Sequence, residues 1–401
     1  MTGTTSPTPP TGHLRRRSLL AALAGTPVAA AALAAAPSAA AAEPAGGPGG
    51  GPGLAVRGAD LSFLLQSEAA GARYLDERGR ARPAEQLLRS HGANWVRLRV
   101  WVDPPAGYSG TASTVELALR AKRAGMKVLV DLHCSDFWAD PAHQTTPAAW
   151  AGQDLPTLAR TVRAYTAETL RTLRAAGAHV DMVQVGNEVT AGMLWPLGQV
   201  YRAGRPDDWE GFTTLLKAGI AGVRDVHPRR RDVPVMVHVD RGGDNGGSRW
   251  FYDHVLERGV DLDVIGQSYY PFWHGSLDDL RANLHDLATR YGKDLVLVET
   301  AYPWTLEDGD GLENLIARRE QLPDADRFPA TPQGQAAYFE ALREVLLSVP
   351  QRRCLGFFAW EPAWLPGVGW EPGAGNPNDN LTMFDHDGRA LPALAAFRPP
   401  R

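Results

Sequence analysis

This chain has few cysteines and a small net charge. Its 401 residues include two cysteines, and 41 lysines and arginines stand against 45 aspartates and glutamates, so the formal net charge is −4. No basic field is present to attract phosphate groups, which excludes nucleic-acid binding as a function class. After residue 42 no apolar run approaches the length of a membrane span, so we expect no membrane partner either.

The N-terminal region has the composition of an export signal. Arg15–Arg17 precede a run of leucines and alanines, and Ala40–Ala42 supply the small residues of a cleavage site. Paired arginines ahead of an apolar run are typical of the twin-arginine type. Glycine and proline interrupt that run, which disfavours a membrane anchor. We predict a signal peptide over residues 1–42, a Pro/Gly-rich leader over 43–53, one mature domain over 54–401, and secretion to the extracellular space.

From residue 54 onward two kinds of segment alternate. Short β-branched runs end in polar or aromatic residues, and longer runs rich in Ala, Leu, Arg and Glu follow with helical spacing. The strand-like runs are Ala55–Asp60, Asn94–Val100, Lys127–His133, Asp181–Gly186, Val233–Asp240, Asp263–Tyr270, Asp294–Glu299 and Cys354–Trp360. The helical runs between them include Val115–Ala124, Leu155–Ala176, Trp209–Val226, Leu277–Tyr291 and Pro332–Leu347.

Eight strands alternating with helices predict an α/β fold, a single (β/α)₈ TIM barrel. The alternative is an open doubly wound sheet, which usually carries a Gly-x-Gly-x-x-Gly turn after its first strand; residues 60–63 read Asp-Leu-Ser-Phe instead. In a parallel barrel Cys134, at the end of one strand, and Cys354, at the start of another, lie at opposite rims. We therefore predict two free thiols.

In a TIM barrel the active site forms at the C-terminal ends of the strands. Polar and titratable groups stand at each of those ends in this sequence. Burying so many charges without a function is costly, so their convergence on one rim predicts a site. In strand order they are Asp60; Arg97 and Arg99; Asp131, His133 and Asp136; Asn187 and Glu188; His238 and Asp240; Ser268 and Tyr270; Glu299; and Trp360 and Glu361.

Two strands that face each other across the barrel close on a glutamate. Strand four ends in Asn187-Glu188 and strand seven in Glu299. A retaining glycosidase uses one carboxylate as nucleophile and one carboxylic acid as proton donor, about 5 to 5.5 Å apart. We expect Asn187 to donate to a substrate hydroxyl. We also expect Arg99 and a tyrosine of strand six to hold Glu299 ionised.

Tryptophan is concentrated near the same rim. Flat aromatic surfaces beside polar groups suit the apolar faces of sugar rings, so these side chains and the two carboxylates together predict glycoside hydrolysis. Trp95 and Trp209, which lie within a strand and a helix, are expected in the core instead. The tryptophans that follow a predicted strand end are Trp101, Trp138, Trp195, Trp273, Trp304, Trp360, Trp364 and Trp370.

The ordered set of strand-end motifs resembles glycoside hydrolase family 53, the endo-β-1,4-galactanases. The segments that carry the resemblance are Gly58–Ser62, Trp95–Trp101, Asp131–His133, Ser135–Pro141, Gln184–Glu188, Ser268–Trp273 and Glu299–Thr305. The resemblance implies that Glu188 is the acid/base, that Glu299 is the nucleophile, and that the substrate is the β-1,4-galactan of pectic arabinogalactan. The expected substrate-binding residues are Asp60, Arg99, His133, Asp136, Asn187, His238, Tyr270, Trp304 and Trp360.

An acidic loop follows strand seven and reads Asp308-Gly-Asp-Gly-Leu-Glu-Asn314. Oxygen ligands at alternating positions resemble a calcium loop. Bacterial members of the resembled family carry a calcium ion here that joins the loops after strands seven and eight, with a histidine where this chain has Leu312. The alternative is a solvated acidic turn. The predicted ligands of a structural Ca²⁺ are Asp308, Asp310, Asn314 and Asp379, with Asn376 and Asn378 in the same loop as Asp379.

The sequence thus predicts a secreted, monomeric retaining endo-galactanase whose partner is a polysaccharide. Two alternatives stay open. One is a related glycosidase that acts on another β-linked plant polysaccharide, such as mannan or xylan. The other is a polysaccharide-binding protein that keeps the cleft without hydrolysis, which the loss of a carboxylate would favour; both glutamates are present.

Overall fold

The computed structural model describes residues 53–105, 108–202, 204–230, 232–371 and 373–399. The predicted signal peptide, residues 1–42, and all of the predicted leader except Gly53 lie outside the described residues. Within the described part of the chain, no helix combines the length and the apolar character needed to cross a membrane.

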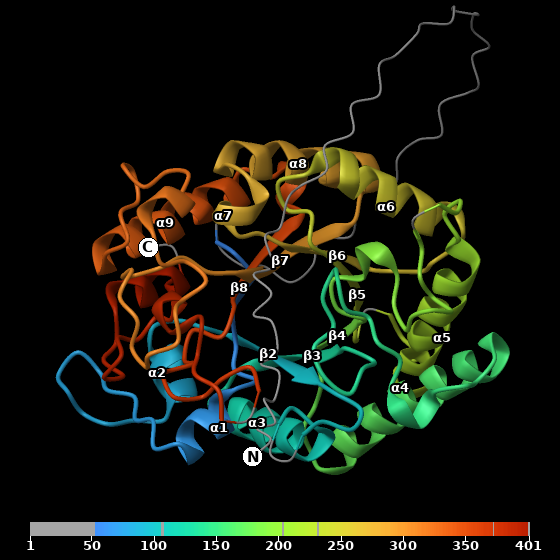
Figure 1. Ribbon diagram of the computed structural model, residues 1–401, viewed down its shortest axis with the longest axis horizontal. Helices are drawn as coiled ribbons and strands as arrows, with labels where there is room; N and C mark the ends of the chain where they lie inside the picture. The colour runs from blue at the N-terminus through green and yellow to red at the C-terminus, as the bar shows by residue number, and fades with distance from the viewer. Residues whose placement is uncertain (1–52, 106–107, 203, 231, 372, 400–401) are drawn as a thin grey trace, which may run out of the picture. The chain divides into compact units, whose positions relative to one another are not determined.

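Eight parallel strands close into a barrel in chain order, and β8 pairs back with β1 (Figure 1). This closure excludes the doubly wound alternative. Seven strands lie within their predicted runs, β7 extends one residue beyond its run to Thr300, and no end differs by more than two residues. The strands are β1 (Val56–Asp60), β2 (Trp95–Val100), β3 (Lys127–Leu132), β4 (Met182–Val185), β5 (Val235–Val239), β6 (Val264–Ser268), β7 (Asp294–Thr300) and β8 (Cys354–Ala359).

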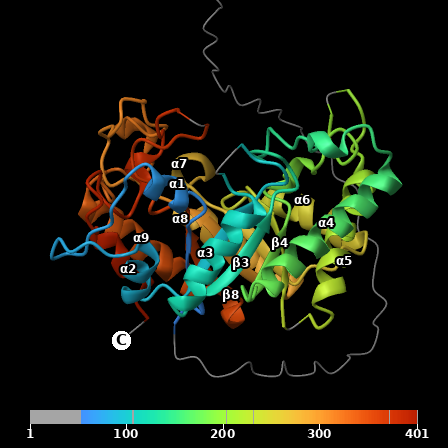
Figure 2. The ribbon, with the colours of Figure 1, turned by 90° about the horizontal axis from the view of Figure 1, so that it is seen from below.

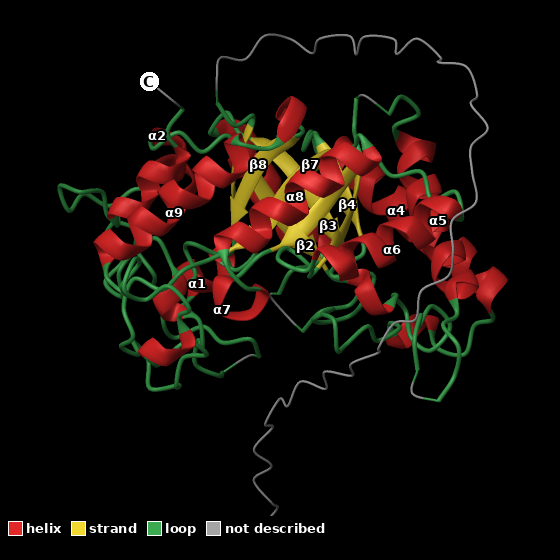
Figure 3. Ribbon diagram, turned by 90° about the horizontal axis from the view of Figure 1, so that it is seen from above, coloured by secondary structure: helices red, strands yellow, loops and turns green. Residues whose placement is uncertain are grey.

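The helices lie outside the strands, as Figure 3 shows. Three have the predicted bounds, α4 is one residue shorter than predicted, and α3 begins at Thr111 rather than Val115. The helices are α1 (Leu64–Ala69), α2 (Ala84–Ser90), α3 (Thr111–Arg123), α4 (Leu155–Ala175), α5 (Trp209–Val226), α6 (Asn245–Glu257), α7 (Pro271–His274), α8 (Leu277–Tyr291) and α9 (Pro332–Leu347).

The barrel interior is layered, because alternate residues of each strand point inward. The lowest layer is apolar and closes the N-terminal end of the barrel. At Gly58 a Cβ atom would lie 2.1 Å from the ring of Phe358, so glycine leaves the room that this ring fills. The buried side chains of this apolar plug are Val56, Trp95, Leu129, Met182, Met236, Val264, Val296, Val298 and Phe358.

The polar residues sit two positions further along the same strands. Arg97 follows Trp95, Asp131 follows Leu129, and His238 follows Met236, so the next layer toward the C-terminal rim is charged and polar. The pairing register sets Asp60 opposite Arg97 and Arg99 opposite Asp131. The fold therefore gathers the predicted strand-end residues on one floor above an apolar plug.

The C-terminal segment covers the outside of the barrel. The turn Pro392–Phe397 packs on α9, and the carbonyl oxygen of Phe397 accepts a hydrogen bond of 2.8 Å from Nε of Arg57. Figure 2 shows α2 and α9 on the same side of the barrel. Cys134 and Cys354 are both buried and free, which confirms the prediction for these two thiols.

Candidate active site

A single buried guanidinium organises the floor of the site. Nη1 of Arg97 lies 2.8 Å from Oδ2 of Asp60 and 2.8 Å from Oε1 of Glu299. Its Nη2 lies 2.8 Å from Oδ2 of Asp131 and 2.8 Å from Oδ1 of Asn187. Burial alone would lower the pKa of Arg97, but the surrounding carboxylates outweigh it and raise the pKa. Arg97 is therefore a permanent cation that joins β1, β3, β4 and β7.

Glu299 is buried at the end of β7 and has two strong partners. Besides the contact with Arg97, its Oε2 accepts a hydrogen bond of 3.0 Å from the hydroxyl of Tyr270. Burial, with the nearby carboxylates of Asp60 and Asp131, raises the pKa of Glu299 above its usual value. Arg97 and Tyr270 limit that rise because both stabilise the ionised carboxylate. The predicted tyrosine contact is confirmed.

The predicted contact between Arg99 and Glu299 is wrong, because Arg97 takes that position. Nη1 of Arg99 lies 3.3 Å from Oε1 of Glu361 instead. Its guanidinium carbon lies 4.2 Å from the ring centroid of Trp138. Two further aromatic rings enclose it, so Arg99 is held in an aromatic cage one layer closer to the rim.

Glu188 follows β4 with the left-handed angles φ 46° and ψ 49°. This conformation is costly for a non-glycine residue and turns the side chain at the strand end. Its Oε1 lies 2.7 Å from Oγ of Ser268, and none of the described lysines and arginines forms an ion pair with it. Burial, then the negative charges of Glu299 and Asp240, raise the pKa of Glu188 well above its usual range.

The two glutamates are thus electrostatically unequal. Both glutamates face other carboxylates, but Glu299 also has a cation and a phenol that favour its ionised form, whereas none of the described lysines and arginines pairs with Glu188. A pair of carboxyl groups whose surroundings push their pKa values apart can act as nucleophile and proton donor. This is the arrangement required for cleavage of a glycosidic bond.

Asn187 and His238 lie just beneath Glu188. The side-chain nitrogen of Asn187 donates a hydrogen bond of 2.8 Å to the carbonyl oxygen of Ala139. The ring of His238 is fully buried, with Nδ1 2.9 Å from Oδ1 of Asn187 and Nε2 2.7 Å from Oγ of Ser268.

Four of the predicted substrate-binding residues have protein partners instead of an open face. Asp60, His133 and His238 are at most 2% exposed, and His133 lies 3.0 Å from Asp131. Asp136 is partly exposed, but its carboxylate accepts hydrogen bonds from the backbone of Asp103 and Ala148 and so ties loops together.

The tryptophans divide into a wall at the rim and a set in the core. The ring centroid of Trp138 lies 4.9 Å from that of Trp370 and 6.4 Å from that of Trp360. Trp273 is 53% exposed and stands edge-on to Tyr270. Trp101 and Trp364 are fully buried and pack behind the wall, so the expectation that they face sugar is wrong. Trp95 and Trp209 are buried as predicted, and Trp195 and Trp304 are partly exposed in the loops after β4 and β7.

The predicted calcium ligands do come together. One carboxylate oxygen from each of Asp308, Asp310 and Asp379 lies within 4.8 Å of the other two. Asn314 donates a hydrogen bond of 2.9 Å from Nδ2 to Oδ1 of Asp379, and its own Oδ1 is buried without a partner. Leu312 is 40% exposed, and its backbone N–H reaches Asp310. Oxygen donors and an unpaired amide oxygen fit a hard cation such as Ca²⁺.

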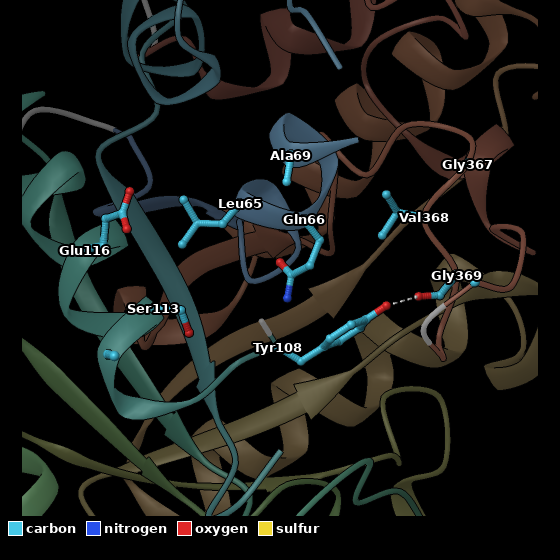
Figure 4. A pocket seen from close by; sticks show the side chains of 11 residues that line it. Leu65, Gln66, Ala69, Tyr108, Ser113, Glu116, Gly367, Val368 and Gly369 are labelled. Atoms are coloured by element: carbon cyan, nitrogen blue, oxygen red, sulfur yellow. Dashed lines mark hydrogen bonds between the residues drawn. The ribbon is translucent and has the colours of Figure 1, made fainter. Parts of the chain in front are cut away.

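A separate cavity of about 620 Å³ lies between α1, the start of α3 and the segment Gly367–Gly369, with Gly373 also in its lining. Figure 4 shows Tyr108 beside this cavity, where its hydroxyl donates a hydrogen bond of 3.4 Å to the carbonyl oxygen of Gly369. The residues that line this cavity include neither Glu188 nor Glu299. The cavity is therefore distinct from the carboxylate site.

Sequence reasoning placed Arg97 and Ser268 at strand ends but assigned neither a role, and it did not single out Gln184. Oε1 of Gln184 accepts a hydrogen bond of 3.3 Å from Nε of Arg97. Its inward position, two residues after Met182, was the available signal.

Two unequal carboxyl groups at the ends of opposite strands, beside a tryptophan wall, define a glycoside hydrolase of the (β/α)₈ class. The chain belongs to glycosyl hydrolase family 53, whose profile matches residues 56–397.

Individual relatives agree with this assignment. An uncharacterised protein of Niallia circulans is 46% identical over 346 residues, which cover 86% of this chain and 93% of that protein. An arabinogalactan endo-β-1,4-galactanase of Humicola insolens is 36% identical over 353 residues, covering 86% and 99%. The solved catalytic domain of an Ignisphaera aggregans family member superposes with a TM-score of 0.81 at 38% identity, covering 88% and 97%.

We predict that Arg97→Met lowers the free energy of unfolding by about 3 to 5 kcal/mol, because it leaves buried carboxylates without their cation. The matched control is Arg163→Met, which breaks an exposed ion pair with Asp225 and is expected to cost less than about 1 kcal/mol. Chemical denaturation of both variants measures the difference. Equal losses would show that Arg97 does not hold the floor together.

Proposed function

We propose that this glycoside hydrolase is an endo-β-1,4-galactanase that cleaves galactan and type I arabinogalactan by a retaining double displacement. The observation that carries the proposal is the unequal pair of carboxyl groups: Glu299 has Arg97 and Tyr270 as partners, and Glu188 has no cation among the described residues. The Humicola insolens relative, an arabinogalactan endo-β-1,4-galactanase at 36% identity, supports the substrate.

In the first step the ionised carboxylate of Glu299 attacks the anomeric carbon. The bond to the leaving oxygen breaks, and Glu188 gives its proton to that oxygen. In the second step ionised Glu188 removes a proton from water, whose oxygen displaces Glu299 and restores both starting states. Attack twice on the same carbon retains its configuration.

The surrounding groups have roles that follow from their contacts. Arg97 and Tyr270 keep Glu299 ionised and fix its two oxygens. Arg97 also orients the amide of Asn187 by donating to its oxygen, which leaves a hydrogen of the amide nitrogen for a substrate hydroxyl. Trp138, Trp360 and Trp370 form a wall suited to the apolar faces of sugar rings.

A panel of galactan, mannan, xylan and glucan tests the substrate. We expect hydrolysis of galactan to internal fragments, and proton NMR of the fresh products to show the β-anomer first, because the mechanism retains configuration. Preferred hydrolysis of mannan or xylan would replace galactan as the substrate. Initial α-anomer would overturn the retaining mechanism.

The two glutamates are separated by an activated aryl β-galactoside. We predict that Glu299→Ala loses turnover by several orders of magnitude, because no covalent intermediate forms. Glu188→Ala should lose less, because this leaving group needs no proton, and added azide should speed its second step and yield a β-galactosyl azide. Rescue of Glu299→Ala with a β-product would reverse the two roles.

We further propose that the protein is exported as a monomer by the twin-arginine signal over residues 1–42, and that it holds one structural Ca²⁺. Asp308, Asp310, Asn314 and Asp379 would bind the ion through oxygen atoms. The ion would offset the repulsion among the three carboxylates and join the loop after β7 to the loop after β8.

Calcium titration tests the metal site directly. We expect one Ca²⁺ per chain in dialysed parent protein, and weaker or no calorimetric binding in Asp310→Ala, because one charged ligand is lost. Asp326→Ala, which changes an exposed carboxylate, is the matched control and should bind as the parent does. Binding by Asp310→Ala equal to that of the parent would show that this loop is not the site.

A further inference from the structure

A chain of short hydrogen bonds leads from Glu188 into the barrel. Oγ of Ser268 lies 2.7 Å from Oε1 of Glu188 and 2.7 Å from Nε2 of His238. On the other side of the ring, Nδ1 of His238 lies 2.9 Å from Oδ1 of Asn187. If Glu188 is ionised, Ser268 donates to it, and that hydrogen bond lowers the pKa of Glu188. If Glu188 is protonated, the direction is reversed, and the distances alone do not decide between the two. The neighbours of Asn187, at the far end of this series of hydrogen bonds, determine which atom donates in each contact.

At that end, the oxygen of Asn187 is an obligate acceptor. Nη2 of Arg97, which can only donate, lies 2.8 Å from this oxygen, and the amide nitrogen of Asn187 donates to Ala139. The amide therefore cannot be reversed. Because Oδ1 has no hydrogen, the hydrogen in its 2.9 Å contact belongs to Nδ1 of His238.

Gln184 is the competing neighbour of the same ring nitrogen, with Nε2 3.1 Å from Nδ1 of His238. The two hydrogens of that amide have closer acceptors, Oδ1 of Asp131 at 2.7 Å and the carbonyl oxygen of Gly186 at 3.0 Å. Its orientation is fixed because Arg97 donates to the amide oxygen. Gln184 therefore leaves Nδ1 of His238 free to donate.

The imidazole is neutral, so a hydrogen on Nδ1 leaves Nε2 bare. Burial lowers the pKa of His238 well below its usual range, and the positive charge of Arg97 acts in the same direction. Nε2 must then accept the hydroxyl hydrogen of Ser268 across the 2.7 Å contact. Ser268 has only lone pairs left for Glu188, so the hydrogen in the second 2.7 Å contact sits on Oε1 of Glu188.

We propose that Ser268 and His238 are positioning residues that hold Glu188 in its protonated form. The proposal rests on the proposed function only in naming Glu188 as the acid. An ionised Glu188 would face a lone pair of Ser268. If the hydroxyl of Ser268 turned its hydrogen to Glu188, Nε2 of His238 would lose its donor. If the hydrogen of His238 moved to Nε2 instead, a bare Nδ1 would face the oxygen of Asn187. This series of hydrogen bonds therefore favours protonated Glu188, the acid needed for the first step.

The charges around Glu188 act in the same sense. Glu299 faces it from β7, Asp240 from the end of β5, and Asp140 from the loop after β3, and all three carboxylates raise its pKa. Tyr270, from the end of β6, is a neutral phenol whose own pKa is raised well above its usual range, first by burial. The hydrogen-bond chain adds a local preference to this field.

The ring nitrogens of His238 can be read directly. In the full-length protein with ¹⁵N-labelled histidine, long-range proton–nitrogen NMR distinguishes a nitrogen that carries hydrogen from a bare one. The signal of His238 is identified by its absence in His238→Gln. We expect hydrogen on Nδ1 and a bare Nε2. Hydrogen on Nε2 alone, or on both nitrogens, would overturn the proposal. This readout needs no substrate, so it stands apart from any failure of the proposed function.

The sign of a pKa change gives a second test. A serine that accepts from Glu188 stabilises the neutral acid, so Ser268→Ala should lower the pKa of Glu188 and move the alkaline limb of kcat/KM down by about one pH unit. The control is Thr300→Val, which removes a buried hydroxyl bonded to Tyr338 and should leave that limb in place. An upward shift of the alkaline limb would identify Ser268 as a donor to Glu188. An unchanged limb would show that Ser268 does not influence the pKa of Glu188. Either result overturns the proposal.

Discussion

One buried cation holds the centre of this protein together. Arg97 receives oxygen atoms from the ends of four strands, and it stays charged because those oxygens more than offset the cost of its burial. A buried charge of this kind is stable only when its partners are all present. The positions of Asp60, Asp131, Asn187 and Glu299 are therefore mutually dependent. The contacts that fix the strand ends of the barrel are the same contacts that fix the geometry of the site.

The chemical difference between the two glutamates comes entirely from their neighbours. Both are the same residue type at the end of a parallel strand. Arg97 and Tyr270 favour charge on Glu299, while carboxylates and a serine–histidine chain surround Glu188. The same guanidinium also fixes the oxygen of Asn187, from which the direction of that chain follows. One arginine thus influences both carboxyl groups by separate routes.

Much of this arrangement was predictable, because strand alternation fixes which face a residue takes and the barrel fixes which end carries the site. Both glutamates, Asn187 and Tyr270 were placed in this way. Depth along the barrel axis was not predictable. Arg97 and Arg99 share a face, and only the register and the cage around Arg99 show which of them reaches Glu299. Trp364 follows its strand as Trp370 does, yet it packs behind the wall.

The apolar plug at the base of the barrel affects how substrate, product and water enter and leave the site. Trp95, Met236 and Phe358 fill the interior below Arg97, so among the described residues the floor of the site is sealed. A detached sugar fragment and an incoming water molecule must then both pass on the rim side of the site. A glycosyl group held on Glu299 would meet whichever hydroxyl occupies that side. Concentrated substrate would favour transfer to a second sugar, and the enzyme would lengthen chains as well as shorten them.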